Sequence, residues 1–287
     1  MFSTRAVDGV IPTLELADEA SGSLAVLAPS RGGILARLRL AGREILYLDR
    51  ATFEDPAVNV RGGCPVLFPS PGKLTGDAFT RGDARGAMKQ HGFARALPWE
   101  IVGTSAQGAA SATLRLASNE ITRAQYPWDF TAEYTYSLRD NVLGVEMLFT
   151  SHAATPMPFG AGFHPYFAVS EADKARARIP TPATRAFDNT LKREVAFAGF
   201  DFTLPEVDLH LVDHGSSTAS LRIEGGLSVT LRGSPELSRW VVWSLRGRDF
   251  ICLEPWTCPG DALNTGDGLL VLAPGETRAL RLEIVCG

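Results

Sequence analysis

The sequence has little cysteine, no surplus of either charge and no long apolar run. Nothing in it approaches the ~18–20 uninterrupted apolar residues of a transmembrane helix, and residues 1–16 show no signal-peptide pattern. We therefore expect a cytoplasmic protein with no membrane partner. Its 287 residues contain four cysteines, too few for a disulfide framework, and we expect reduced thiols at Cys64, Cys252, Cys258 and Cys286.

Several families of catalytic and binding motif are also absent. The formal net charge is −4, from 28 basic and 32 acidic side chains, so the composition does not indicate a nucleic-acid partner. The chain has no Gly-x-Ser-x-Gly element and no Cys-x-x-Cys pair. Gly62-Gly63 lacks the Gly-Lys-Ser/Thr ending of a phosphate-binding loop. Serine-hydrolase, dinucleotide and zinc-ribbon chemistry therefore have little support.

What the chain does contain is a series of short strand patterns. Apolar and polar residues alternate over segments that end in turn residues, such as Ala41-Gly42, Asp140-Asn141 and Gly225-Gly226. Long segments with helical period are scarce. We predict an all-β fold, a large antiparallel β-sandwich with few short helices, formed as a single domain over residues 1–287. The clearest strand patterns lie at residues 34–40, 131–138, 221–223, 227–231 and 278–285.

Two segments interrupt this succession of strand patterns. Residues 70–90 are rich in Gly, Asp, Arg and Lys and predict a long loop or a protruding hairpin. Residues 171–194 are charged and contain Pro180 and Pro182, with a short helix or a loop expected at 171–178. Long loops in compact domains are often functional.

Two titratable residues stand among apolar and aromatic neighbours. His164 lies in Gly-Phe-His-Pro-Tyr-Phe, where the following proline favours an extended backbone. Glu254 follows the apolar run 250–253 and precedes Pro255-Trp256. Desolvation there would raise the pKa of the carboxyl toward the range useful for a base. A buried structural histidine and a glutamate paired with an arginine are the alternatives.

The other histidines give weaker signals. His91 is followed by Gly92, which would allow close approach of a ligand or of another backbone segment. His210 and His214 have the spacing of two zinc ligands on one helical turn. However, the alternation at 208–211 indicates a strand, which would separate the two side chains. We therefore expect no metal site.

Two further side chains could contact a ligand. Arg61 stands beside the Gly62-Gly63 turn, and its guanidinium suits vicinal hydroxyls, carboxylate or phosphate. Trp256 could offer a flat face to a sugar ring or fill the core.

Taken together, these motifs resemble the aldose 1-epimerase (mutarotase) family. The resemblance implies a galactose-mutarotase sandwich with a sugar cleft over one sheet. It is carried by the following segments: Arg-Gly-Gly-Cys-Pro-Val-Leu-Phe-Pro at 61–69, His-Gly-Phe-Ala-Arg at 91–95, the segment 158–167 ending His-Pro-Tyr-Phe, Glu-Pro-Trp-Thr at 254–257 and Leu-Ala-Pro-Gly-Glu at 272–276.

The resemblance also implies roles for individual residues. His164 would be the general acid and Glu254 the general base of ring opening, with no metal or redox cofactor. His91 and Arg61 would bind sugar hydroxyls. Asp208 is a less secure substrate ligand, because Glu206-Val207 replace the usual Gly-aromatic context. Arg95 and Trp256 would form the pocket wall or support it, and the protein would act on a small sugar as a monomer or a homodimer.

Three other functions stay open at this point. The Arg-Gly-Gly-x-Pro and His-Gly-Phe-Ala-Arg elements also resemble the hexose-6-phosphate epimerase branch, in which extra arginines grip a phosphate. Lys73, Arg81 and Arg85 could supply such a clamp or simply be solvated. A non-catalytic sugar-binding protein is the second alternative. A lyase or glycosidase is the third, although glycosidases need two carboxylates and Glu254 has no evident partner.

Overall fold

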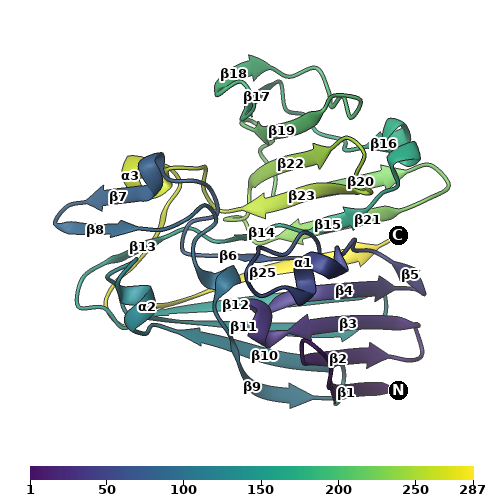
Figure 1. The fold of residues 1–287 in the computed structure, drawn as a ribbon, viewed down its shortest axis with the longest axis horizontal. Helices are drawn as coiled ribbons and strands as arrows, with labels where there is room; N and C mark the ends of the chain where they lie inside the picture. Colours follow the sequence, from purple (N-terminus) through teal and green to yellow (C-terminus); the bar gives the residue numbers. More distant parts are fainter.

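Strands form about half of the chain in the computed structural model, which describes residues 1–287 (Figure 1). The strands are antiparallel within every sheet, so the predicted all-β fold is confirmed. No helix has the length and apolarity that crossing a membrane would require.

One layer of the sandwich is an eight-stranded sheet with long, half-buried central strands. Every second side chain of β11 (Phe130–Arg139) points into the core. The strand is rich in aromatic residues and Thr, which suit a pleated surface. The predicted turn at Asp140-Asn141 joins it to β12 (Val142–Ser151). The other strands of this sheet are β16 (Ala177–Arg178), β20 (Thr218–Ile223), β21 (Ser228–Gly233), β25 (Thr277–Cys286), β10 (Ala110–Ala117) and β9 (Glu100–Ser105).

Two sheets lie against this layer. The first contains β1 (Phe2–Val7), β2 (Thr13–Asp18), β3 (Ser23–Ala28), β4 (Ile34–Leu40) and β5 (Arg43–Glu44). The second contains β18 (Arg193–Ala196), β17 (Arg185–Asp188), β19 (Glu206–Leu211), β22 (Arg239–Leu245), β23 (Phe250–Trp256), β14 (Gly162–Phe163), β6 (Val66–Leu67) and β15 (Tyr166–Ala168). Isolated bridges such as Leu35–Cys64 and Leu46–Phe167 connect the two sheets.

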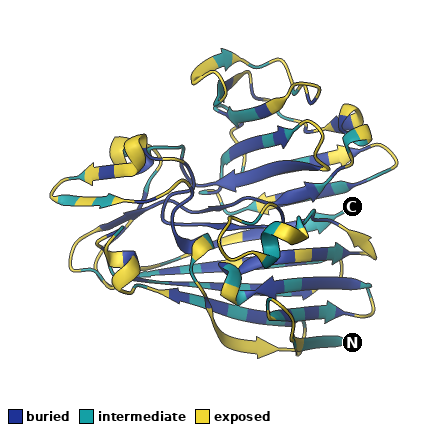
Figure 2. Cartoon of the chain, in the orientation of Figure 1, coloured by how far each residue is buried: buried dark blue, intermediate teal, exposed yellow.

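Aromatic side chains fill the space between the layers. Figure 2 shows the central strands dark with buried residues while their alternate positions reach solvent. Phe163 of β14 packs edge-on against Tyr134 of β11, with ring centroids 5.7 Å apart. Phe68 lies among five aromatic rings and is fully buried. Dense packing of this kind fixes the backbone from which the pocket residues project.

The two segments predicted to interrupt the strand pattern, residues 70–90 and 171–194, contain short regular elements. Residues 70–90 contain a hairpin that projects from one end of the molecule in Figure 1, made of β7 (Ala78–Arg81) and β8 (Ala84–Ala87). Residues 171–176 form a 3-10 helix, η4 (Glu171–Arg176), that leads directly into β16. The remaining elements are short: η1 (Pro29–Arg31), α1 (Arg50–Glu54), η2 (Thr75–Asp77), η3 (Ala94–Ala96), α2 (Glu120–Arg123), β13 (Met157–Phe159), α3 (Ala262–Thr265) and β24 (Leu270–Leu272).

Candidate active site

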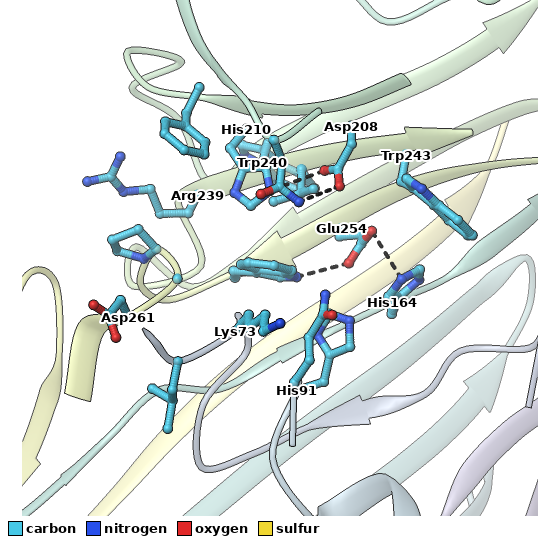
Figure 3. A pocket seen from close by; sticks show the side chains of 18 of the residues that line it. Lys73, His91, His164, Asp208, His210, Arg239, Trp240, Trp243, Glu254 and Asp261 are labelled. Atoms are coloured by element: carbon cyan, nitrogen blue, oxygen red, sulfur yellow. Dashed lines mark hydrogen bonds and ion pairs between the residues drawn. The ribbon is translucent and has the colours of Figure 1, made fainter. Parts of the chain in front are cut away.

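A pocket of about 960 Å³ is lined by residues of β19, β22 and β23 and by the loops on either side of the β7–β8 hairpin. Its walls hold side chains far apart in sequence (Figure 3). The structure brings together all seven residues that the sequence nominated: Arg61, His91, Arg95, His164, Asp208, Glu254 and Trp256.

Glu254 lies within β23, in the centre of its sheet, and only 1% of it is exposed. Trp256 stands two residues further on, so both side chains project from the same face of the strand. The Trp256 indole Nε1 donates a hydrogen bond of 3.1 Å to Glu254 Oε2. Trp256 is therefore both a wall of the pocket and a partner of the carboxylate.

His164 reaches Glu254 because of how the strands pair. It occupies the link between β14 and β15, and both strands pair with β23. The backbone N–H of His164 donates to Pro65 O at 3.1 Å, and its ring stacks on Tyr166 with centroids 4.8 Å apart. His164 Nε2 consequently lies 3.4 Å from Glu254 Oε1 (Figure 3).

Burial drives both members of this pair toward their neutral forms. Burial, with the charge of Asp208 adding to it, raises the pKa of the Glu254 carboxyl well above its ordinary range. Burial, with further effects from His91 and the Arg95 guanidinium, lowers the pKa of His164 well below 6.5. A carboxylic acid beside a neutral imidazole holds the same number of protons as a carboxylate beside an imidazolium. One proton transfer across the contact converts the first state into the second.

His91 is held by a tightly constrained turn. Its φ is 73°. Residue 92 has φ 70° and has to be glycine, because a Cβ there would lie 2.2 Å from Phe68 O. His91 Nδ1 contacts the carbonyl oxygen of Pro71, which can only accept, so Nδ1 carries the hydrogen. Burial lowers the pKa of His91 to about 3. The neutral ring therefore keeps Nε2 as an acceptor for a ligand hydroxyl.

Asp208 enters the pocket despite its unusual sequence context. Asn189 Nδ2 donates a 2.6 Å hydrogen bond to Asp208 Oδ2, and His210 Nε2 lies 3.3 Å from Asp208 Oδ1. The predicted strand at 208–211 is confirmed as part of β19. His214 lies outside the pocket, where it hydrogen-bonds Thr181 and Thr218.

Three arginines line the pocket, and of these Arg239 pairs with Asp267 while Arg61 and Arg95 form no ion pair with a carboxylate. The Arg61 guanidinium lies 5.6 Å from the centroid of the Trp243 ring, and Arg95 Nη2 donates to Gln90 O at 3.0 Å. Among the three residues considered for a phosphate clamp, Lys73 lines the pocket while Arg81 and Arg85 do not. Arg81 and Arg85 lie on β7 and β8 outside the pocket, as the solvated alternative predicts, so the hairpin supplies no phosphate clamp.

Sequence reasoning missed several pocket residues. His210 shares a strand face with Asp208, and the alternation of that segment could have revealed it. Trp243 pairs directly opposite Asp208 in the adjacent strand, and its indole donates to Glu206 Oε1 at 2.8 Å. That register, like the position of Asn189, has no signal in a single sequence.

The comparisons with known proteins agree with this fold. A sequence profile of the aldose 1-epimerase family matches residues 13–285. The solved structure of Slr1438 from Synechocystis sp. PCC 6803 superposes with a TM-score of 0.92 at 34% identity and covers 96% of this chain and 95% of that one. A galactose mutarotase-like protein from Clostridium acetobutylicum shares the fold, with a TM-score of 0.83 at 17% identity and coverage of 100% and 98%.

Curated relatives match over shorter stretches. A Salmonella typhimurium protein provisionally named glucose-6-phosphate 1-epimerase is 34% identical over 31% of this chain. The matches to the first three curated relatives cover 27%, 56% and 32% of those proteins' lengths.

Proposed function

The chain belongs to the aldose 1-epimerase family, and we propose that it interconverts the α and β anomers of a free aldohexose, as an isomerase. The observation that carries this proposal is the 3.4 Å contact between His164 Nε2 and Glu254 Oε1 inside a pocket of sugar-accommodating size. Anomer exchange needs a proton removed from one oxygen and a proton delivered to another in the same step.

The two oxygens involved are both bonded to C1 of the sugar. A base and an acid that touch one another can therefore reach both at once. In this mechanism Glu254 takes the proton from the anomeric hydroxyl while His164 protonates the ring oxygen, and the C1–ring-oxygen bond breaks to an open-chain aldehyde. Rotation about C1–C2 presents the other carbonyl face. Glu254 then protonates the carbonyl oxygen as His164 accepts the proton of the attacking hydroxyl.

The buried setting suits this exchange of roles. Ring opening leaves Glu254 protonated and His164 neutral, which is the state that burial favours. The enzyme form that accompanies the open-chain sugar is thus stabilised, and no proton has to come from solvent. Each positioned acid or base typically contributes ~10²–10⁴-fold to the rate.

The charges of the pocket support an uncharged substrate. Five basic and six acidic side chains line it, so there is no cationic surplus to attract a phosphate. The Nε2 acceptor of His91, the carboxylate of Asp208 and the guanidinium of Arg61 supply acceptors and donors for hydroxyl groups. A neutral aldohexose meets these requirements.

Glucose 6-phosphate is the second candidate substrate. Arg61 and Arg95 have no carboxylate partner, which leaves two guanidiniums with donors available to a phosphate. The provisional names of the Salmonella and Cenchrus ciliaris relatives point the same way, the latter at 23% identity over 75% of this chain.

Polarimetry on freshly dissolved α-glucose and α-galactose, with NMR exchange on glucose 6-phosphate, tests the function and ranks the substrates. We expect faster equilibration of a free hexose than of glucose 6-phosphate. Preferential acceleration of the phosphorylated sugar would select the second candidate. No acceleration of any of the three would contradict both.

A further inference from the structure

A buried thiol lies beside the proposed acid/base pair. Cys252 precedes Glu254 by two residues on β23, so the two side chains project from the same strand face. Cys252 pairs with Tyr166 of β15, two residues after His164. One donor atom from each of His164, Cys252 and Glu254 lies within 4.8 Å of the other two. Cys252 is a free cysteine with no measurable exposure.

These three side chains supply the ligand types that zinc prefers. Zinc binds imidazole nitrogen, thiolate sulfur and carboxylate oxygen, and a zinc ion with three protein ligands keeps a fourth position open. Bonds of about 2.0–2.3 Å place the ligand atoms of a tetrahedral ion about 3.3–3.8 Å apart. A separation of 4.8 Å therefore has to close by about 1.0–1.5 Å, which side-chain rotation can provide.

The second ring nitrogen of His164 leaves the imidazole free to change its orientation. Only 7% of His164 is exposed, and its Nδ1 atom is buried with no hydrogen-bond partner. Buried polar atoms are normally paired, so an unpaired ring nitrogen here is unusual. No hydrogen bond at Nδ1 has to be broken for the imidazole to reorient toward a cation.

We propose that His164, Cys252 and Glu254 form an inhibitory site for a thiophilic divalent cation, with Zn²⁺ as the best match. The cation displaces two protons to solvent, the thiol proton of Cys252 and the proton that Glu254 and His164 share, and leaves its open position for water. Mg²⁺ and Ca²⁺ are poor candidates because they require mostly oxygen ligands. The prediction that the cation competes with sugar rests on the proposed function, since the cation would bind the atoms of His164 and Glu254 that transfer protons. Binding itself does not depend on that function.

The test is a titration of the metal-free full-length chain with Zn²⁺ in competition with a chromophoric chelator. We expect one Zn²⁺ per chain. Cys252→Ser should weaken binding at least about tenfold, because losing even an outer-sphere partner of a metal site costs about 10–100-fold. Cys258→Ser is the matched control: its thiol is equally buried but lies outside the cluster. That variant should bind Zn²⁺ as the wild type does.

Co²⁺ gives a readout of the ligands themselves. We expect a thiolate-to-Co²⁺ charge-transfer band in the wild type and in Cys258→Ser, and none in Cys252→Ser. Absence of the band in the wild type, absence of stoichiometric Zn²⁺ binding, or unchanged affinity in Cys252→Ser would overturn the site. Absence of the wild-type band overturns the site even if Cys252→Ser does not fold.

Sugar kinetics separate this proposal from the proposed function. Zn²⁺ should raise the apparent KM for the sugar, and saturating sugar should weaken Zn²⁺ binding. Bound Zn²⁺ that leaves sugar turnover unchanged would overturn the inhibitory role. A metal-free protein that turns over no sugar would contradict the proposed function, while the Co²⁺ band would still support the metal site.

Discussion

Replacing Trp256 with Phe removes one hydrogen-bond donor from the Glu254 carboxylate and keeps an aromatic ring in the pocket wall. The indole Nε1 lies 3.1 Å from Glu254 Oε2, and 3% of Trp256 is exposed, so solvent has little access to replace the lost donor. The bond favours the charged carboxylate and so opposes the effect of burial on the pKa of Glu254. Its loss should make the base form scarcer.

The expected size of the effect follows from the kind of bond. A hydrogen bond to a charged group contributes about 1.5–3 kcal/mol. Each 1.36 kcal/mol is a factor of ten in rate, so kcat for anomer exchange should fall about ten- to a hundredfold. KM should change less, because the bond acts on the catalytic carboxylate rather than on the sugar.

A second tryptophan provides the control. Trp243 also lines the pocket, and its indole donates a hydrogen bond of 2.8 Å to Glu206 Oε1, a carboxylate with no proposed catalytic role. Trp243→Phe removes the same kind of bond and should retain kcat within a few-fold. Equal kcat values for the two variants, measured by NMR exchange on folded protein, would refute the reasoning.

Three further predictions concern the charges and hydroxyl contacts of the pocket. In the active enzyme Glu254 and His164 share one proton, and burial opposes binding of a second. The value of kcat should therefore stay constant as the pH falls through 6.5. A drop in kcat centred on that pH would show that His164 titrates normally. Asp208→Asn should move the alkaline limb of the pH–rate profile to lower pH, because the negative charge of Asp208 helps to raise the pKa of Glu254. An alkaline limb at the wild-type pH would exclude this effect of Asp208 on Glu254. His91→Ala should raise KM about tenfold, the cost of about one lost hydrogen bond, with kcat largely retained; steady-state kinetics with unchanged KM would assign His91 a structural role.

Local patterns in the sequence predicted the strands well. The segment 34–40 coincides with β4, and residues 131–138 lie within β11. Alternation is a local property of a half-buried strand, so it can be read without knowing the partner. The turn at Asp140-Asn141 was equally predictable, since both its residues tolerate the required backbone.

The pocket itself could be predicted only in part. Apolar surroundings indicated that Glu254 is buried, but its contact with His164 depends on two strands pairing with β23 across about 90 residues of chain. Nothing local encodes that register, and the motif resemblance alone brought the two residues together. The position of Cys252 beside Glu254 follows from its place two residues earlier on the same strand, whereas its approach to His164 depends on the same pairing.

The most direct test is the rate of exchange between α- and β-glucose, measured by NMR for the wild type, Glu254→Gln and His164→Asn. Far-ultraviolet circular dichroism would establish that each variant is folded. Each substitution should lower the enzyme-dependent rate by at least ~10²-fold, because it removes one of the two proton carriers. Wild-type exchange in either folded variant would contradict the proposal that this pair opens the sugar ring.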